Sequence, residues 1–440
     1  KQNNYFGFGT DNDLETPHGM PIIKQAGFAL PSLQEGGPEY DEGFQLPCAR
    51  VLGAARGRKK AFRPNSIVNL SAMSFGSLSS RAVEALNRGC AIASCLHNTG
   101  EGGISPYHQH GGELIWQIGT GYFGCRNSDG RFSLSRFLET VERHPVRAIE
   151  IKLSQGAKPG MGGLLPAGKI TPEIARIRGI PMNQDCASPA SHTAFHDVDS
   201  LLDFVEMLAD RSGLPVGIKS AVGEQSFWEQ LAQGLSDSSR GVDFITIDGG
   251  EGGTGAAPLI FSDHVALPFK TGFVRVYREF IRRNLHTRVV FIGSGRLGLP
   301  VNAITALSLG CDLINVAREG MLAIGCIQAQ RCHTGHCPTG VATQNRWLMR
   351  GLDPASKSAR LANYVLTLRK ELIAVSRACG HVHPALIPPD QVEILEARYR
   401  STPLSEVFGT HEFDNWGLPG VEDMATIQQL MKRDNAAGEY

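Results

Sequence analysis

The chain has 440 residues, 42% hydrophobic and 20% charged, and its 43 basic and 43 acidic side chains leave no formal net charge. This size allows one large α/β domain with a substantial core, or two smaller domains. The sequence contains no long run of one charge sign and no uncharged apolar run of about eighteen residues, which argues against nucleic-acid binding, an anionic membrane surface and a membrane span.

Residues 1–62 are rich in glycine, proline and charge without sustained periodicity, and we expect an arm wrapped on the domain that follows. The first residue is Lys1 rather than Met, so we expect a trimmed chain and leave open an upstream signal or membrane anchor. Many of the ten cysteines, such as Cys90 and Cys95, lie in apolar surroundings, as buried free thiols do. This favours a reducing cytoplasm.

From Ser66 the chain repeats a short aliphatic run, a glycine-rich polar loop and a longer segment with helical spacing. The pattern predicts eight strands, at Ile67–Met73, Ala93–His97, Leu114–Gly119, Ala148–Leu153, Val216–Ser220, Phe244–Asp248, Val289–Ile292 and Leu313–Val316. It predicts helices between most of them, including Ser79–Ala93, Ser133–Arg143, Val198–Arg211, Gly272–Asn284 and Pro300–Leu309. Eight alternating units favour an α/β fold of the TIM (β/α)8 barrel type, with a doubly wound open sheet as the structural alternative.

Glycines and polar residues follow the strands at six of the expected strand ends. Examples are Ser71–Gly76, Asn98–Gly103, Lys152–Gly160, Asp248–Gly255 and Gly293–Arg296. Glycine lets backbone amides approach an anion or a flat ring closely, although a single such loop would mean only a tight turn. Six loops on one barrel face indicate a bound cofactor.

The run Gly293-Ser-Gly295-Arg-Leu-Gly298 has the dinucleotide spacing G-x-G-x-x-G after a strand and before a helix. A dinucleotide fold needs an acid at the end of the next strand, but the nearest acid, Asp312, stands at that strand's start. We therefore prefer the phosphate site that barrels form after strands seven and eight. A flavin phosphate would lie on the Gly293–Gly295 amides, with Asn315–Arg318 as the second wall.

Two lysines, Lys152 and Lys219, end strands that point into the same barrel mouth. Such a lysine can stabilise the anionic edge of a reduced flavin or a substrate carboxylate. An isolated lysine would more often be a surface salt-bridge partner, but the strand-end placement favours the functional role.

Three thiols lie close together at Cys326, Cys332 and Cys337, and Pro338 follows the last of them. Thiolates are the usual ligands of iron–sulfur clusters, and a proline after the last ligand recurs in such runs. Three ligands suit a cubane that lacks one iron. Zinc bound with His333 or His336, and unliganded thiols, remain the alternatives at this point.

These motifs together resemble the flavin-binding synthase domain of the glutamate synthase family. The resemblance rests on Ser71–Ser80, Gly100–Gly103, Gln155–Gly160, Thr171–Arg178, Gly252–Gly255 and the cysteine run through Gln344. It implies FMN on the barrel beside a [3Fe-4S] cluster held by the three cysteines in loop 326–344. The resemblance covers about residues 66–345. We expect the chain to divide into an N-terminal arm at 1–62, an FMN-binding barrel at 63–350, and a C-terminal helical extension and polar tail at 351–440.

The resemblance also implies the reaction, in which reduced FMN gives hydride to 2-iminoglutarate made from 2-oxoglutarate and ammonia, so that glutamate forms. Carried over by motif, the 2-oxoglutarate contacts are Glu101, Lys152, Gln155 and Arg178, the first three being the expected catalytic residues. The expected FMN site comprises Met73, Ser74, Lys219, Gly252, Gly253, Thr254, Gly293, Ser294, Gly295, Asn315 and Arg318. Arginine and lysine suit a dicarboxylate, and Glu101 could orient or deprotonate the ammonia.

Two loops depart from the family pattern, at Ser188-Pro-Ala-Ser-His192-Thr-Ala-Phe-His196-Asp197 and at Asp248-Gly-Gly-Glu251. They leave the oxo acid and the amine open, so an N-alkylglutamate synthase that uses a primary amine is an alternative. A flavin and iron–sulfur electron-transfer component without turnover is another. With no glutaminase or NADPH region in the sequence, we expect ammonia or an amine from elsewhere, for example from a separate glutaminase, and electrons from a ferredoxin-like donor. A homo-oligomer stays open.

Beyond residue 351 the pattern predicts a long amphipathic helix, Ala355–Ala378, followed by Cys379-Gly-His381-Val-His383-Pro. The last cluster could bind a metal, but a helix cap at Gly380 followed by a proline stop is the favoured interpretation. The final residues, 433–440, are expected to form a polar, mobile tail.

Overall fold

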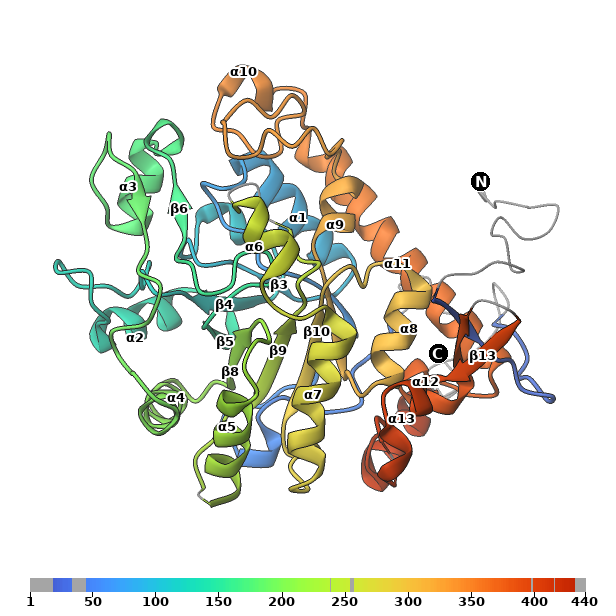
Figure 1. Cartoon of the computed structure of the whole chain (residues 1–440). Coiled ribbons are helices and arrows are strands. Elements are labelled where there is room, and N and C mark those ends of the chain that lie inside the picture. Colours follow the sequence, from blue (N-terminus) through green and yellow to red (C-terminus); the bar gives the residue numbers. More distant parts are fainter. Residues whose placement is uncertain are drawn as a thin grey trace, which may run out of the picture.

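Eight parallel strands close into a barrel in the order β10-β11-β2-β3-β4-β5-β8-β9 (Figure 1). The computed structural model describes residues 19–33, 45–237, 239–253, 257–396, 399–414 and 416–431. The barrel strands are β2 (Val68–Leu70), β3 (His97–Asn98), β4 (Leu114–Ile118), β5 (Val146–Lys152), β8 (Val216–Ser220), β9 (Phe244–Asp248), β10 (Val290–Ser294) and β11 (Leu313–Val316). The predicted TIM barrel is confirmed, and the open-sheet alternative is wrong.

Helices surround the barrel and close its outer face. They are α1 (Ser80–Ile92), α2 (Leu134–Arg143), α4 (Val198–Ser212), α5 (Ser226–Asp237), α6 (Leu259–His264), α7 (Phe269–Ile281), α8 (Pro300–Ser308), α9 (Arg318–Ala323), α10 (Arg346–Met349) and α11 (Pro354–Ala378). The long helix α11 packs along α1, where a Cβ on Gly89 would stand 2.8 Å from the Leu361 side chain. A larger residue at Gly89 would therefore push the two helices apart.

The second barrel strand differs from its predicted position. The apolar run from Ala93 predicts a strand that ends at His97, whereas β3 is His97–Asn98. Helix α1 ends at Ile92, one residue before its predicted end, and the chain turns through Ser94, whose φ is 50°, before the strand begins. Short apolar runs look alike whether they extend or turn into a core, because burial alone sets their composition.

The segment between β5 and β8, which we call the β5–β8 insertion, lies over the barrel mouth. It contains the hairpin strands β6 (Leu164–Leu165) and β7 (Cys186–Ala187), the short 3-10 helix η3 (Ala167–Lys169) and helix α3 (Pro172–Arg178). Thr171 caps α3 through its side chain, and Gly179 ends it in the left-handed region. The cap and the stop fix where Arg178 leaves the helix.

The described part of the N-terminal segment pairs with the C-terminal extension. Strand β1 (Met20–Ile23) joins β12 (Val392–Glu396) and β13 (Arg400–Pro403) in a small sheet, followed by α12 (Leu404–Val407) and α13 (Val421–Met431). The division into arm, barrel and extension stays a prediction, since residues 1–18 and 34–44 and the expected tail at 433–440 lie outside the described residues. Among the helices of the described ranges, none has the length and apolarity needed to cross a membrane.

Candidate active site

The predicted catalytic residues meet at the carboxyl ends of the barrel strands. Lys152, the last residue of β5, places its Nζ 2.9 Å from Oε1 of Glu101 and 2.6 Å from Oε1 of Gln155. Glu101 follows β3 and is closely enclosed, because a Cβ on Gly119 or Gly163 would stand 2.6 or 2.8 Å from its carboxylate oxygens. Segments at the ends of two different strands, β3 and β5, therefore build one polar cluster.

Arg178 reaches the same cluster from the β5–β8 insertion. It is buried, its Nη2 donates to the Phe75 carbonyl oxygen at 3.0 Å, and its guanidinium lies 5.1 Å from the Phe123 ring centre. Its Nε has no hydrogen-bond partner among the described residues. An unpaired donor of this kind suits a site that awaits an anion.

The cluster carries more positive than negative charge. Burial would raise the pKa of Glu101, but Lys152, Arg178 and Lys158 hold it below its usual value. Glu101 therefore stays ionised at neutral pH. Because three cations surround one carboxylate, the site has a surplus of positive charge for an anionic ligand.

His192, from the loop that departs from the family pattern, supports Lys152 from behind. Its Nε2 lies 2.9 Å from the Lys152 carbonyl oxygen, and its Nδ1 lies 3.1 Å from the Tyr122 hydroxyl. That hydroxyl accepts from the backbone amides of Thr193 and Ala194, so it donates to Nδ1, and Nε2 donates to Lys152. Burial lowers the pKa of His192 to about 4, and the ring is neutral with a fixed tautomer.

The second lysine lies beside the first, on the neighbouring strand. Lys152 and Lys219 are register partners in β5 and β8, and Nζ of Lys219 is 3.4 Å from Oδ2 of Asp248. Burial would lower the pKa of Lys219, but Asp248, Glu150 and Glu101 raise it, so the ammonium persists. A buried cation at the mouth can stabilise negative charge that develops on a neighbouring ring.

A buried carboxylate beneath the two lysines was not predicted from the sequence. Glu150 is fully buried inside the barrel and accepts hydrogen bonds from Asn98, Gln117 and Thr246 at 2.6–2.7 Å. These donors replace the water that an ionised carboxylate would otherwise need. Glu150 thus supplies a counter-charge to Lys219 from below.

The expected FMN residues surround the same mouth. A Cβ on Gly100 would stand 2.8 Å from the Ser74 amide nitrogen, so Gly100 and the loop with Met73 and Ser74 touch. Ser294 Oγ donates to Asp248 Oδ1 at 2.9 Å, and Arg318 lies beside Gly253. Gly252, Gly293, Gly295 and Asn315 lie in or directly beside the same strand ends, whereas Thr254 lies outside the described residues.

One acid adjoins the expected phosphate wall. Glu251 Oε2 accepts from the Phe269 amide at 2.8 Å, at the start of α7, and would stand 3.4 Å from a Cβ on Gly295. Nη2 of Arg318 lies 3.3 Å from the Glu251 carbonyl oxygen. A phosphate on this wall would therefore be placed between Arg318 and a carboxylate, and the arginine would have to offset the repulsion.

The three cysteines of the loop, all within the described residues, do not form a ready metal site. The pKa of Cys332 is raised by burial and by the neighbouring Cys337 and Cys326 thiols. Gln328 and Gln330, between the first two cysteines, have φ of 55° and 56°, an unusual conformation for residues with side chains. Across the described residues, no three His, Cys, Asp or Glu side chains are grouped closely enough to hold a metal ion.

The loop between β2 and α1 connects the β5–β8 insertion with the cysteine loop. Its four successive carbonyl oxygens, at residues 75–78, accept hydrogen bonds from Arg178, Gln344, Lys169 and again Gln344, at 2.7–3.1 Å. Lys169 also donates to the Cys332 carbonyl oxygen at 3.1 Å. The substrate residues and the cysteines are therefore tied to one short segment.

The two histidines after α11 serve other purposes than metal binding. Gly380, with φ of 84°, ends the helix as expected, and His383 Nε2 lies 3.1 Å from the Pro47 carbonyl oxygen. His381 Nε2 lies 2.7 Å from Gln391 Oε1. The capping interpretation is confirmed.

Comparison with known proteins identifies a set of relatives. A family described as the conserved region in glutamate synthase matches residues 52–382. The glutamate synthase large subunit-like protein YerD of Bacillus subtilis is 40% identical over 324 residues, which cover 73% of this chain and 62% of that protein. An archaeal glutamate synthase (NADPH) of Methanocaldococcus jannaschii is 34% identical over 321 residues, covering 71% of this chain and 59% of that protein.

The match is to only part of these relatives, since it spans about 60% of the length of the two curated proteins. The glutamate synthase (NADPH) large chain of Bacillus subtilis is 32% identical over 326 residues, which are 20% of its length. Among solved structures, a mutant flavocytochrome b2 with pyruvate bound matches with a TM-score of 0.49 and 14% identity, covering 90% of this chain and 81% of that chain. No argument about ligands follows from so distant a likeness.

Proposed function

Because the chain belongs to the family defined by the conserved region in glutamate synthase, we propose that it is an FMN and [3Fe-4S] oxidoreductase that converts 2-oxoglutarate and ammonia to glutamate. The observation that carries the proposal is the cluster of Glu101, Lys152 and Gln155 beside Arg178. A dicarboxylic oxo acid needs a cationic contact for each carboxylate, and its amination needs a carboxylate that binds the nitrogen nucleophile and accepts its proton. Arg178 and Lys152 can provide the first, and Glu101 the second.

In the proposed reaction, Arg178 and Lys152 bind the two carboxylates of the oxo acid and hold its C2 carbon over the barrel mouth. The Glu101 carboxylate, kept ionised by its cationic neighbours, orients the incoming ammonium and accepts a proton as nitrogen bonds to C2. The C2 oxygen takes one proton from the attached nitrogen and a second from Lys152, and it leaves as water, which gives protonated 2-iminoglutarate. Bound FMN would supply the hydride that reduces this imine.

The residues at the mouth fit a flavin. Glycines in the loops after β9 and β10 would let backbone amides approach a ring and a phosphate closely, and Lys219 stays cationic at the end of the neighbouring β8. Met73, Ser74, Gly253 and Arg318 would complete the FMN site, with Gly252, Thr254, Gly293, Ser294, Gly295 and Asn315 as the remaining predicted contacts.

The donor set of the loop fits an iron–sulfur cluster. The neighbouring Cys337 and Cys326 raise the pKa of Cys332, and the strained Gln328 and Gln330 in the same loop are typical of a functional segment. These three thiolates would hold the cluster, which would pass electrons singly to the flavin. Since the thiols are not yet grouped as a metal site, binding the cluster would draw them together.

The proposal includes the supply of substrates. Ammonia, or an amine, comes from outside the chain, and a ferredoxin-like protein supplies the electrons. None of the ten cysteines, all within the described residues, forms a disulfide, which supports a reducing compartment such as the cytoplasm.

A second candidate, N-alkylglutamate synthesis from a primary amine, is favoured by the 188–192 loop. The Pro189 carbonyl oxygen accepts from Thr120 Oγ1 at 2.7 Å, and His192 supports Lys152. A loop that departs from the family pattern thus forms one wall of the site, where it can select the amine.

The test is turnover by the anaerobically reduced protein, given 2-oxoglutarate with ammonia or with methylamine. Formation of glutamate from ammonia supports the first candidate, and preferential formation of N-methylglutamate supports the second. If neither product forms, although 2-oxoglutarate binds, the synthase proposal is wrong.

A further inference from the structure

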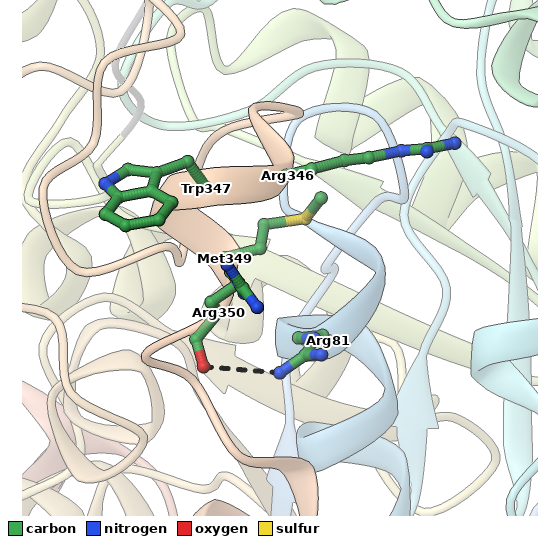
Figure 2. Close-up of a pocket in the computed structure, with 5 residues that line it drawn as sticks. All are labelled: Arg81, Arg346, Trp347, Met349 and Arg350. Atoms are coloured by element: carbon green, nitrogen blue, oxygen red, sulfur yellow. Dashed lines mark hydrogen bonds between the residues drawn. The ribbon is translucent and has the colours of Figure 1, made fainter.

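A basic and aromatic hollow lies on α10 and the start of α1 (Figure 2). It measures about 440 Å³ and is lined by Arg81, Arg346, Trp347, Met349 and Arg350, which we call the arginine–tryptophan patch. Trp347 is 73% exposed, and the Arg350 guanidinium lies 5.6 Å from its ring centre. The described lining contains three guanidinium groups and no carboxylate.

The patch has a defined geometry. The side chain of Asn345 caps α10 by accepting from the amides of Trp347 and Leu348 at 2.9 and 3.3 Å. Arg81, on α1, places Nη1 3.4 Å from the Arg350 carbonyl oxygen and 3.3 Å from the Leu352 carbonyl oxygen. These contacts hold α10 against α1, as the dashed line in Figure 2 marks for Arg350. The exposed indole is therefore presented on an anchored turn.

The patch is continuous with the cysteine loop. A Cβ on Gly340, shortly after Cys337, would stand 2.6 Å from the Leu348 carbonyl oxygen and 2.9 Å from the Met349 Cα. Gln344 ties the intervening chain to the 75–78 segment. The backbone that carries the patch therefore packs against the cysteine loop.

The charge of this region differs from that of the whole chain. Residues 326–352 contain Arg331, Arg346 and Arg350 but neither Asp nor Glu, although the chain as a whole has no net charge. Ile327, next to the first cysteine, is 65% exposed. Basic side chains and an exposed apolar one thus lie in the same stretch of chain as the cysteines.

We propose that the arginine–tryptophan patch docks a small acidic electron-carrier protein that delivers electrons to the cysteine loop. The delivery of electrons rests on the proposed function, whereas the docking of the partner rests on the patch itself. Tryptophan, arginine and methionine are enriched at protein interfaces, and the first two dominate binding energy there. Complementary charge speeds encounter, and electron-transfer partners need only a small contact area.

A protein fits this surface better than a small anion. Arg81 already spends hydrogen bonds on backbone carbonyl oxygens, and Arg350 lies over the indole. Few guanidinium donors therefore remain to enclose a phosphate. A protein carrier would use the exposed indole as an apolar anchor and the arginines as a charged rim.

The test compares the purified holoprotein with the double variant Arg346→Glu and Arg350→Glu, and with Trp347→Ala. The matched control, Arg136→Glu with Arg143→Glu, makes the same charge change on exposed positions of α2. Stopped-flow spectroscopy follows reduction by a reduced acidic [2Fe–2S] ferredoxin at about 10 mM ionic strength, where charges act over about 30 Å. Dithionite serves as the small-molecule reductant.

We expect the patch double variant to lose at least tenfold in the ferredoxin rate, the control to stay within twofold, and dithionite reduction to be unchanged. Raising the salt should bring the parent protein towards the variant. Equal ferredoxin rates in the patch variant and the control would overturn the proposal.

Calorimetric binding of oxidised ferredoxin separates this inference from the cofactor assignment, because it needs no electron transfer. Binding that weakens in the patch variant but not in the control supports docking even if the cofactors are misassigned. Absence of ferredoxin binding, with inorganic phosphate bound at the patch instead, would assign a small-anion site and refute the docking proposal.

Discussion

Glu101 has one basic partner at hydrogen-bonding distance and two further cations nearby, so its charge can be tested apart from its shape. In Glu101→Gln, the amide oxygen can still accept from Lys152, but the negative charge is lost. We expect turnover with ammonia to fall about 10²-fold or more, because the nitrogen nucleophile loses its base. The Kd for 2-oxoglutarate, from titration of the visible spectrum, should stay equal or decrease, because a repelling carboxylate is gone.

The opposite result for binding and turnover would contradict the role of Glu101 as a base. Weaker 2-oxoglutarate binding with unchanged turnover would mean that Glu101 only braces Lys152. Ser188→Ala, in the neighbouring loop, is a useful control, since its hydroxyl lies near Glu101's glycine wall without charge.

The sequence predicted the members of this site one loop at a time. Lys152 and Lys219 stood out because they end strands, and Arg178 entered only through the family motif. Glu150 and His192 were not assigned roles, because a polar residue within a strand or loop gives no sign of which neighbours it will meet. Their roles depend on contacts between segments far apart in the chain.

The 75–78 segment is linked to the β5–β8 insertion and to the cysteine loop through Lys169. This lysine is 5% exposed and donates to the carbonyl oxygens of Ser77 and Cys332. A buried ammonium beside an anionic cluster would stabilise the reduced form most, because that form carries the extra negative charge.

We therefore predict that Lys169→Met lowers the reduction potential of the bound cluster, whereas Lys169→Arg keeps it near the parent value. Redox titration followed by electron paramagnetic resonance measures the potential without any turnover. An unchanged potential in Lys169→Met, with the cluster still bound, would show that the lysine serves only to hold the loops.

Element boundaries were predictable where local chemistry decides them. The β-branched strands appear within a few residues of their predicted ranges, as do α4 and α11, which have capping side chains, and α8, which begins with a proline. Strand β3 was placed too early, and the β6–β7 hairpin was not predicted. All three of these strands, β3, β6 and β7, have only two residues. Contacts with neighbouring segments, rather than their own sequence, determine where they form.

For the whole molecule, buried histidines predict acid sensitivity. Burial lowers the pKa of both His108 and His383 to about 4, against about 6.5 in the unfolded chain. The unfolded state therefore binds more protons between these values. Stability is fully present above pH of about 6.5 and is lost as pH falls towards 4, by up to about 1.4 kcal/mol per pH unit for each histidine.

Denaturant unfolding between pH 4.5 and 7.5 measures this slope. His383→Gln should flatten it, while His196→Gln, whose ring is exposed, should leave it unchanged. If both variants keep the parent slope, His383 does not titrate on unfolding as its burial implies.

We propose that one barrel mouth binds FMN and an oxo acid beside a three-cysteine cluster. The most direct measurement is the visible spectrum of anaerobically purified protein, with FMN, iron and sulfide quantified, before and after addition of 2-oxoglutarate. We expect flavin bands over a broad iron–sulfur shoulder, shifted by the oxo acid. A colourless protein that contains zinc would contradict both the cluster and the mechanism built on it.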